Sequence, residues 1–236
     1  MESTVNSKRI MTSEKISGWT SHDYIPFQHC FIFMNHANAW DRVYRSRGRL
    51  WGGGVKDLPE LPAGSSVLEM GCGSGKTLAG LAGCGRRVIA LDISVQALRL
   101  CRPCGPKIDL ILGDACRLPF QSESFDAVFA FHVTGHLLLA GRCALAREAA
   151  RVLKSEGRLF FREFGAEDMR AKKGQEVERG TFRRQDGIIT HYFTEAEAMV
   201  LFGDLEPVYV CTRRWRLRVK GQDLMRSEVE AVFLKT

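Results

Sequence analysis

The segment Val67-Leu-Glu-Met-Gly-Cys-Gly-Ser-Gly-Lys-Thr77 decides the fold that we predict for this chain. A short apolar run leads into closely spaced glycines, and a helical pattern follows over residues 76–83. Glycine has no side chain to keep a ligand away from the backbone. The backbone amides and the positive end of the helix would then face that ligand. The segment therefore predicts a strand, a ligand-binding turn and a helix in succession.

Three nucleotide-binding patterns compete for this turn. A P-loop requires Gly five residues before Gly75, and Met70 stands at that position. The dinucleotide pattern GxGxxG, started at Gly71, requires Gly where the chain has Lys76. The pattern that remains is GxGxG behind an acidic residue, formed by Glu69, Gly71, Gly73 and Gly75.

From about residue 65, short β-branched runs alternate with helical patterns, which predicts βαβ units and a parallel sheet. The strands are expected over residues 66–70, 87–91, 107–112, 125–131 and 157–164. The helices between them are expected over 76–83, 95–101 and 140–153. This is an α/β fold.

The pattern changes after the fifth strand. Asp186-Gly187 predicts a hairpin between residues 180–184 and 188–193. Thr194 and Glu197 predict a capping box for a short helix. Two late strands, 207–219 and 228–234, are expected to form an antiparallel pair. We predict an N-terminal helical extension over 1–60 and one α/β domain over 61–236, with an insert at about 165–193.

Two carboxylates follow predicted strands. Asp92 ends the second strand, where a carboxylate can accept hydrogen bonds from both hydroxyls of a ribose. Asp114 follows the third strand. Each has a plain structural alternative, since Asp92 can cap the next helix and Asp114 can lie in a solvated turn.

Together with Leu118-Pro-Phe120 and Ser124-Phe-Asp-Ala-Val128, these features resemble the class I S-adenosylmethionine-dependent methyltransferases. The resemblance implies a Rossmann-like fold: a mostly parallel seven-stranded sheet with an antiparallel last strand and helices on both faces. It also implies that the glycine turn wraps the methionine part of the cofactor, and that Asp92 and Asp114 bind its ribose and adenine. The cofactor site so implied consists of Glu69, Gly71, Cys72, Gly73, Gly75, Asp92, Ile93, Asp114, Ala115 and Phe131.

A closer resemblance lies downstream. Arg162-Glu-Phe-Gly165, followed by Asp168, the hairpin up to Gly187 and Tyr192-Phe-Thr194, is similar to the tRNA 3-methylcytidine methyltransferases. Trp40-Asp41 and Tyr44 are similar to the Trp-Asp-x-x-Tyr of that family. Glu163 replaces the family's usual Asp, and Ile188-Ile189 replaces its Thr-Arg. The resemblance implies tRNA as the partner and a base as the methyl acceptor.

Two alternatives stay open. A small-molecule methyltransferase would use the insert as a lid over a compact pocket. A tRNA wobble-uridine methyltransferase would work with a small zinc-ribbon activator, for which the apolar strand Ile108–Leu112 offers a sheet edge.

The candidate catalytic residues lie at the ends of the fourth and fifth strands: His132, Arg162, Glu163 and Asp168. A methyl group on a sulfonium is already electrophilic, and cytosine N3 carries a free lone pair, so the reaction needs positioning more than a strong base. For His132 the alternative is a structural hydrogen bond, and for Arg162 and Asp168 it is a salt bridge.

Substrate-binding candidates are aromatic or basic. Arg214, Arg216, Arg218 and Lys220 alternate with apolar residues, which on a strand puts all four cations on one face. We call these residues the basic stripe and expect RNA phosphate contacts there. The predicted substrate-binding residues are Trp40, Tyr44, Arg183, Arg184, Arg216 and Arg218.

The composition sets the remaining expectations. There are 34 Lys and Arg against 27 Asp and Glu, a net charge of +7 that is compatible with a polyanion such as tRNA, and DNA is not expected. No apolar run reaches the roughly 20 residues of a membrane helix, and residues 1–15 do not form a secretory signal. We therefore expect a cytoplasmic protein with reduced cysteines. No standard zinc spacing is present, so no metal is expected.

Overall fold

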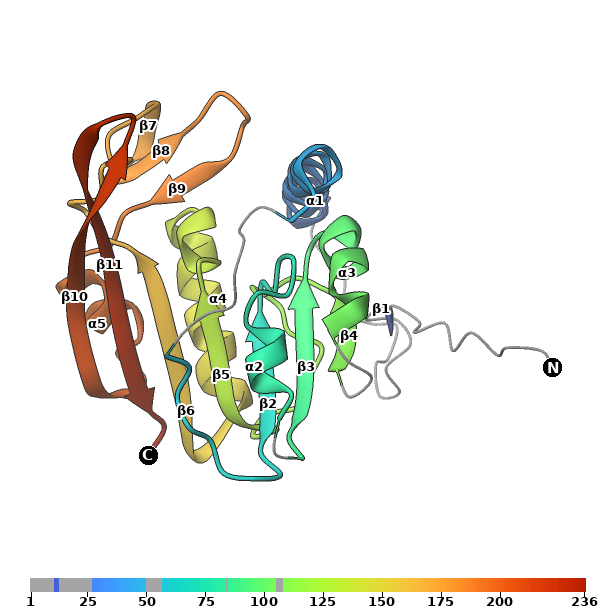
Figure 1. Ribbon diagram of the computed structural model, residues 1–236. Coiled ribbons are helices and arrows are strands. Elements are labelled where there is room, and N and C mark those ends of the chain that lie inside the picture. The colour runs from blue at the N-terminus through green and yellow to red at the C-terminus, as the bar shows by residue number, and fades with distance from the viewer. Residues whose placement is uncertain (1–10, 13–26, 50–56, 84, 105–107) are drawn as a thin grey trace.

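The parallel sheet is built from apolar strands that are covered on both faces. The computed structural model describes residues 11–12, 27–49, 57–83, 85–104 and 108–236 (Figure 1). Five parallel strands form the centre in the order β4-β3-β2-β5-β6. Their bounds are β2 Ser66–Met70, β3 Arg87–Asp92, β4 Ile108–Leu112, β5 Phe125–Phe131 and β6 Leu153–Phe164. Near-continuous apolar runs are typical of such doubly covered strands.

Antiparallel strands complete the sheet on the β6 side. Strand β11 (Gln222–Leu234) pairs antiparallel with β6 and with β10 (Glu206–Val219), which forms the outer edge. On the other side, β1 (Met11–Thr12) adds a two-residue parallel strand to β4. The predicted mostly parallel seven-stranded sheet with an antiparallel last strand is confirmed, and β1 is an addition to it.

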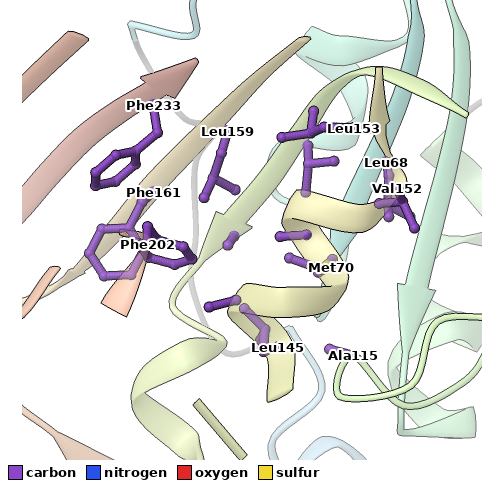
Figure 2. Packing of buried hydrophobic residues seen from close by; sticks show 14 of the residues in the cluster. Leu68, Met70, Ala115, Leu145, Val152, Leu153, Leu159, Phe161, Phe202 and Phe233 are labelled. Carbon is purple, nitrogen blue, oxygen red and sulfur yellow. The ribbon is translucent and has the colours of Figure 1, made fainter. Parts of the chain in front are cut away.

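Helices cover both faces of the sheet. On one face, α4 (Leu139–Val152) and α5 (Glu195–Leu201) pack on a core that includes Phe161, Phe202 and Phe233 (Figure 2). On the other face lie the short helix α2 (Leu78–Leu81) and helix α3 (Val95–Cys101), which continues into a 3-10 turn over Arg102–Cys104. The two cores meet through the sheet, so the strands are fixed from both sides.

Three further elements lie beyond the carboxyl ends of the parallel strands (Figure 1). Helix α1 (Phe27–Arg47) lies above the end of β3, close to α3. A 3-10 turn, η3 (Thr134–His136), follows β5. The insert forms a separate antiparallel sheet of β7 (Gln175–Glu178), β8 (Thr181–Arg183) and β9 (Ile189–His191). These elements surround the edge at which a parallel sheet binds its ligands.

Local sequence signals account for most of these elements. The hairpin at Asp186-Gly187 is confirmed as β8 and β9, with Gly187 at φ +82°. The capping box is confirmed, because the Thr194 hydroxyl accepts from the Glu197 amide and the Glu197 carboxylate accepts from the Thr194 amide.

The structure corrects three predicted boundaries. Helix α2 begins at Leu78 and not at Lys76, because the turn continues through Thr77. Strand β6 begins at Leu153 and not at Gly157, because Leu153 pairs with Phe125. Strand β11 begins at Gln222, because it pairs with β10 along the whole hairpin, and β7 was not predicted.

In the part of the chain that the structure describes, no helix is both long and apolar enough to cross a membrane.

We predict that Phe233→Ala lowers the free energy of unfolding by about 3–5 kcal/mol. The Phe233 side chain is fully buried, and its ring centroid lies 5.2 Å from that of Phe202. Denaturant unfolding followed by circular dichroism measures the change. Val208→Ala is the matched control, since Val208 is 57% exposed on the edge strand and its truncation should change stability little. Equal losses for both variants would contradict the assignment of this core.

Candidate functional site

The glycine turn is held by the neighbouring strand. The amides of Gly71 and Cys72 donate to the carbonyl of Leu91 at 2.8 and 3.0 Å. The Gly73 amide donates to Asp92 Oδ2 at 2.8 Å. Two residues that are far apart in the sequence are therefore fixed against each other at the carboxyl ends of β2 and β3.

Glycine is required at two positions of this turn. Gly71 and Gly73 have φ values of +69° and +54°, a region that side chains disfavour. A Cβ on Gly71 would lie 2.5 Å from the Val133 side chain, and one on Gly73 would lie 2.7 Å from the Tyr44 hydroxyl. Because Gly71 and Gly73 have no side chains, Val133 after β5 and Tyr44 of α1 can pack directly against the backbone of the turn.

Asp92 is a buried carboxylate with spare acceptor capacity. Its Oδ1 accepts from the Ser94 amide at 2.8 Å, and the Ile93 amide also donates to this carboxylate. An ionised carboxylate has about four acceptor positions. Burial raises the pKa of Asp92 to about 6, although the backbone hydrogen bonds from Ser94, Gly73 and Ile93 act in the opposite direction. Asp92 can thus accept further hydrogen bonds, as a ribose diol would supply.

Glu69 lies at the bottom of the turn. It is buried and accepts a hydrogen bond from the Thr77 hydroxyl through Oε1. Among the described residues, Oε2 has no hydrogen-bond partner. Burial raises the pKa of Glu69 to about 8. A cationic ligand group beside this carboxylate would favour its ionised form.

Two adjoining pockets flank the turn. The first is lined by Asp92, Ile93, Asp114 and Ala115 together with Val133 and Leu137. The Asp114 side chain accepts from the Cys116 amide at 2.8 Å, so it also stabilises its own turn. The second pocket is a cleft of about 750 Å³. Five residues line both: Trp40, Tyr44, Gly71, His132 and His136.

Helix α1 covers the turn because an acidic side chain fixes it to α3. The Asp41 carboxylate accepts from the Ser94 hydroxyl and from the Gln96 amide, both at the N-terminus of α3, where a carboxylate is favourable. This places the Tyr44 hydroxyl over Gly73 and the Trp40 ring 4.8 Å from the His136 ring. Trp40 and Tyr44, predicted to bind substrate, thus lie at the junction of the two pockets.

The cleft is basic and aromatic. Its wall opposite the glycine turn comes from the end of β6, the insert and the β10–β11 hairpin. The cations that line it are Arg47, Arg49, Lys76, Arg162, Arg170, Arg184 and Arg226, and the aromatic residues beyond Trp40 and Tyr44 are Phe131, Phe164, Tyr192 and Trp215.

Asp168 holds part of this wall in place. Its side chain is fully buried and forms ion pairs with Arg170 at 2.8 Å and Arg226 at 2.7 Å. These guanidinium groups hold the pKa of Asp168 below its usual range. Both also lie over the Phe164 ring, at 3.8 and 5.6 Å from its centroid. The structure therefore places Asp168 behind the cleft, where it orients two arginines, and not on the cleft surface.

His132 has an unusual backbone. Its φ is +55°, rare for a residue with a side chain, and its amide donates to the Arg162 carbonyl at 2.8 Å. Its ring lies against Phe164, with centroids 4.5 Å apart. Burial lowers the pKa of His132 to about 3. The imidazole is therefore neutral at physiological pH.

The other two predicted catalytic residues are engaged with the protein. Glu163 is buried, and Oε1 accepts from the Gly135 amide at 2.8 Å; burial raises its pKa to about 8. Arg162 pairs with Glu230 at 3.0 Å and lies over the Phe131 ring. Arg162 lines the cleft, whereas Glu163 lies behind it.

The basic stripe lies outside the cleft. Residues alternate across a strand, and Trp215 lines the cleft, so the stripe lies on the opposite face of β10. Arg214 pairs with Glu167 and Arg218 with Asp223. Arg216, Arg218 and Arg183 do not line the cleft, but Arg184 does.

The sequence analysis did not single out several residues that line the cleft, and three of them form its wall near Phe164: Arg170, Arg226 and Glu228. A signal for two of them was available, since Arg226, Glu228 and Glu230 alternate with the buried Ser227, Val229 and Ala231. Arg170 lies in a polar loop and had no such signal. No group of side chains suited to a metal ion exists among the described residues.

Comparisons with known proteins identify the domain. A protein-family profile described as a methyltransferase domain matches residues 68–161, from the glycine turn to β6. A solved S-adenosylmethionine-dependent methyltransferase from Methanosarcina mazei superposes with a TM-score of 0.62 at 26% identity, over 76% of this chain and 99% of the other. The chain has the fold of a class I methyltransferase domain. The predicted cofactor of this domain class, S-adenosylmethionine, is thereby supported.

Curated relatives differ in what they act on. Demethylmenaquinone methyltransferase of Paenarthrobacter aurescens is 37% identical over 125 residues, 52% of this chain and 48% of the relative. A tRNA N(3)-cytidine methyltransferase of Gallus gallus is 28% identical over 162 residues, 62% of this chain and 44% of the relative. A tRNA N(3)-methylcytidine methyltransferase of Drosophila melanogaster is 26% identical over 189 residues, covering 72% and 58%. This chain thus spans about half the length of the curated relatives it matches.

The methyltransferase domain also resembles a partnered protein in fold. A chain from the complex between the Haloferax volcanii methyltransferase activator and a methyltransferase superposes with a TM-score of 0.59 at 17% identity. The match covers 88% of this chain and 94% of the other.

The residues present fit S-adenosylmethionine. The unpartnered Glu69 Oε2 suits a cofactor with a sulfonium and an ammonium group, and Asp92 has acceptor positions left for ribose hydroxyls. The two adjoining pockets give separate places for a nucleoside and for a methionine chain beside the methyl acceptor.

We predict that S-adenosylhomocysteine binds more weakly as the pH falls below 6. Protonation of Asp92, whose pKa is about 6, removes acceptors for the ribose, so the Kd should rise about tenfold for each pH unit below that value. Isothermal titration calorimetry between about pH 7.5 and about pH 5 measures this. Asp92→Asn is the control: it should bind weakly and should lack the additional weakening below pH 6, keeping only the pH dependence that comes from Glu69, whose pKa is about 8. A constant wild-type affinity over this range would exclude Asp92 as the titrating ribose ligand.

Proposed function

We propose that this chain is an active S-adenosylmethionine-dependent methyltransferase and that it methylates a base in tRNA, with a ring nitrogen of cytidine as the acceptor. One observation carries the proposal. The cleft that opens from the glycine turn is lined by seven cations and by stacked aromatic and guanidinium groups. The cations can bind the phosphates of an RNA, and the aromatic and guanidinium groups can stack on an unstacked base.

In this proposal the cofactor residues are those expected from the sequence. Asp92 and Ile93 hold the ribose side, Asp114 and Ala115 the adenine, and the turn from Gly71 to Gly75 the methionine part. Glu69, Cys72 and Phe131 complete this site. S-adenosylmethionine supplies the electrophilic methyl group when bound.

The protein's own contribution is positioning and exclusion of water. His132 stays neutral and presents its ring to the cleft beside Phe164. Glu163 fixes the backbone that carries Gly135 and His136, and Asp168 fixes Arg170 and Arg226. Because cytosine N3 is unprotonated near neutral pH, no group has to remove a proton from it before transfer.

The length over which this chain aligns with its relatives supports a tRNA substrate. The match to demethylmenaquinone methyltransferase is the more identical one but is limited to 125 residues. The matches to the two tRNA methyltransferases extend over 162 and 189 residues. We retain a small-molecule acceptor as the second candidate because of that higher identity. The division into an N-terminal extension (1–60) and a methyltransferase domain (61–236) remains part of the proposal.

A zinc-ribbon activator is a further proposal. The fold resemblance to a chain from an activator complex supports it. On this chain, β1 pairs with Ile111 and Leu112 of β4. An activator strand could pair with the β4 edge at those residues only by displacing β1.

The purified chain, bulk tRNA and isotope-labelled S-adenosylmethionine test the proposed function. Digested tRNA is then analysed by mass spectrometry for methylated nucleosides, and the expected product is 3-methylcytidine. Asp92→Ala is the negative control. Label in demethylmenaquinol but not in tRNA would replace this proposal with the small-molecule function. Label in a uridine derivative would shift it to the wobble-uridine alternative.

We predict that Arg184→Ala reduces the magnitude of the negative slope of log K against log salt for tRNA binding by about 1, because one phosphate contact is lost. Arg184 is exposed, lines the cleft and has no ion pair with another described residue. Filter binding between about 50 and about 200 mM salt measures the slope. An unchanged slope would remove Arg184 from the RNA-binding surface.

The double variant Arg216→Ala/Arg218→Ala tests the basic stripe in the same assay. A slope of smaller magnitude would show that the RNA contact extends around the edge of β10. An unchanged slope would restrict the contact to the cleft. Affinity for S-adenosylhomocysteine should stay at the wild-type value in all these variants, since none of them lines the pocket that holds Asp92.

A further inference from the structure

Glu228 is a carboxylate that the fold places in the basic cleft without an assigned role. It lies on β11 opposite Phe164 of β6, and it lines the cleft. Its side chain is 16% exposed. Its Oε1 lies 3.4 Å from His132 Nε2, and no hydrogen bond to its side chain occurs among the described residues.

The other two acids of the cleft are already engaged. Glu69 lies under the glycine turn and accepts from Thr77. Asp186 accepts from the Ile188 amide at 3.1 Å and lies 3.9 Å from Arg47. Glu228 is therefore the acid of the described cleft whose side chain accepts no hydrogen bond from another described residue, and it lies beside the aromatic surface that His132 and Phe164 form.

The charges around Glu228 make it an acceptor and not a phosphate contact. Burial raises its pKa, while the cations Arg162, Arg226 and Arg170 act in the opposite direction and favour the ionised form. Neighbouring Glu230 and Glu163 are acids as well, and Glu230 pairs with Arg162. A carboxylate in such a place repels phosphate and carbonyl oxygens and accepts from amino groups.

Nucleobases differ in whether they can donate a hydrogen bond to such a carboxylate. Cytosine and adenine carry an exocyclic amino group, which donates, beside the ring nitrogen with the lone pair. Uracil carries a carbonyl oxygen at the corresponding position. Glutamate accepting from the amino group of cytosine is an established pairing in protein–nucleic acid recognition.

We propose that Glu228 selects the base that enters the cleft by accepting a hydrogen bond from its exocyclic amino group, so that amino-bearing bases are preferred to uracil. This rests on the proposed function, because it assumes that a nucleobase occupies the cleft. Glu228 acts here as a specificity-determining residue, and methyl transfer itself does not require it to move a proton.

Binding of short single-stranded RNA tests this inference without methyl transfer. Fluorescein-labelled oligo(C) and oligo(U) of equal length are titrated with the full chain in the presence of S-adenosylhomocysteine, and fluorescence anisotropy is measured. The wild type should bind oligo(C) about tenfold more tightly than oligo(U). In Glu228→Gln the amide can donate as well as accept, so the ratio should fall to about 1.

The ratio is the decisive quantity. Removal of a negative charge from a basic cleft should strengthen binding of both oligonucleotides, so affinity alone does not report on base selection. Glu206→Gln is the matched control: it removes one carboxylate from the same hairpin at an exposed position and should keep the wild-type ratio. Glu228→Met, which has no strong acceptor, is the second variant and should also give a ratio of about 1.

Two results would overturn the inference. One is a wild-type ratio near 1, including failure to bind either oligonucleotide. The other is a wild-type preference for oligo(C) that persists in both Glu228 variants. Because no methyl group is transferred in this assay, its outcome is separate from that of the tRNA methylation experiment. Methylated tRNA together with an unchanged ratio would leave the proposed function standing and remove Glu228 from it.

Discussion

The hydrogen bond from the Gly73 amide to Asp92 is the interaction on which the site depends. It fixes the turn after β2 to the last residue of β3, so that the two parts of the nucleotide-binding edge cannot move independently. The turn must also pass directly beneath Tyr44, which the φ of +54° at Gly73 and the absence of a Cβ allow. The same carboxylate is buried, and the loss of solvent around its charged form raises its pKa to about 6.

The second constraint is electrostatic and lies across the cleft. Guanidinium groups repel one another, yet Arg170 and Arg226 lie over the same Phe164 ring. The buried Asp168 makes this arrangement stable, because it pairs with both. The result is a rigid cationic and aromatic wall that faces the glycine turn. Such a wall is suited to holding a planar group that carries phosphate on one side.

The sequence predicted most of the fold, and many of the residues that it singled out line the two pockets. The order and approximate positions of the strands and the capping box at Thr194 follow from local periodicity and hydrogen-bonding chemistry, which short segments contain, whereas the starts of β6 and β11 depend on strand pairing. The roles of His132 and Asp168 do not, since a salt bridge and a substrate contact require the same residue types. Only burial distinguishes them: the Asp168 side chain is fully buried behind the cleft, whereas that of His132 is 33% exposed.

The sequence by itself determined the α/β fold class and the ligand-binding turn, because the spacing of the glycines around β2 is imposed by the backbone geometry of that turn. Tertiary structure alone decided what faces the acceptor. Arg170, Arg226 and Glu228 come from a loop and a late strand, and their meeting depends on the antiparallel pairing of β11 with β6. The basic stripe illustrates the same limit, since alternation groups its cations on one face of β10 but does not say which face borders the cleft. The face of β10 that carries the stripe packs toward α5, where Thr212 bonds to Glu195, so the other face borders the cleft. These contacts join residues that are distant in the chain.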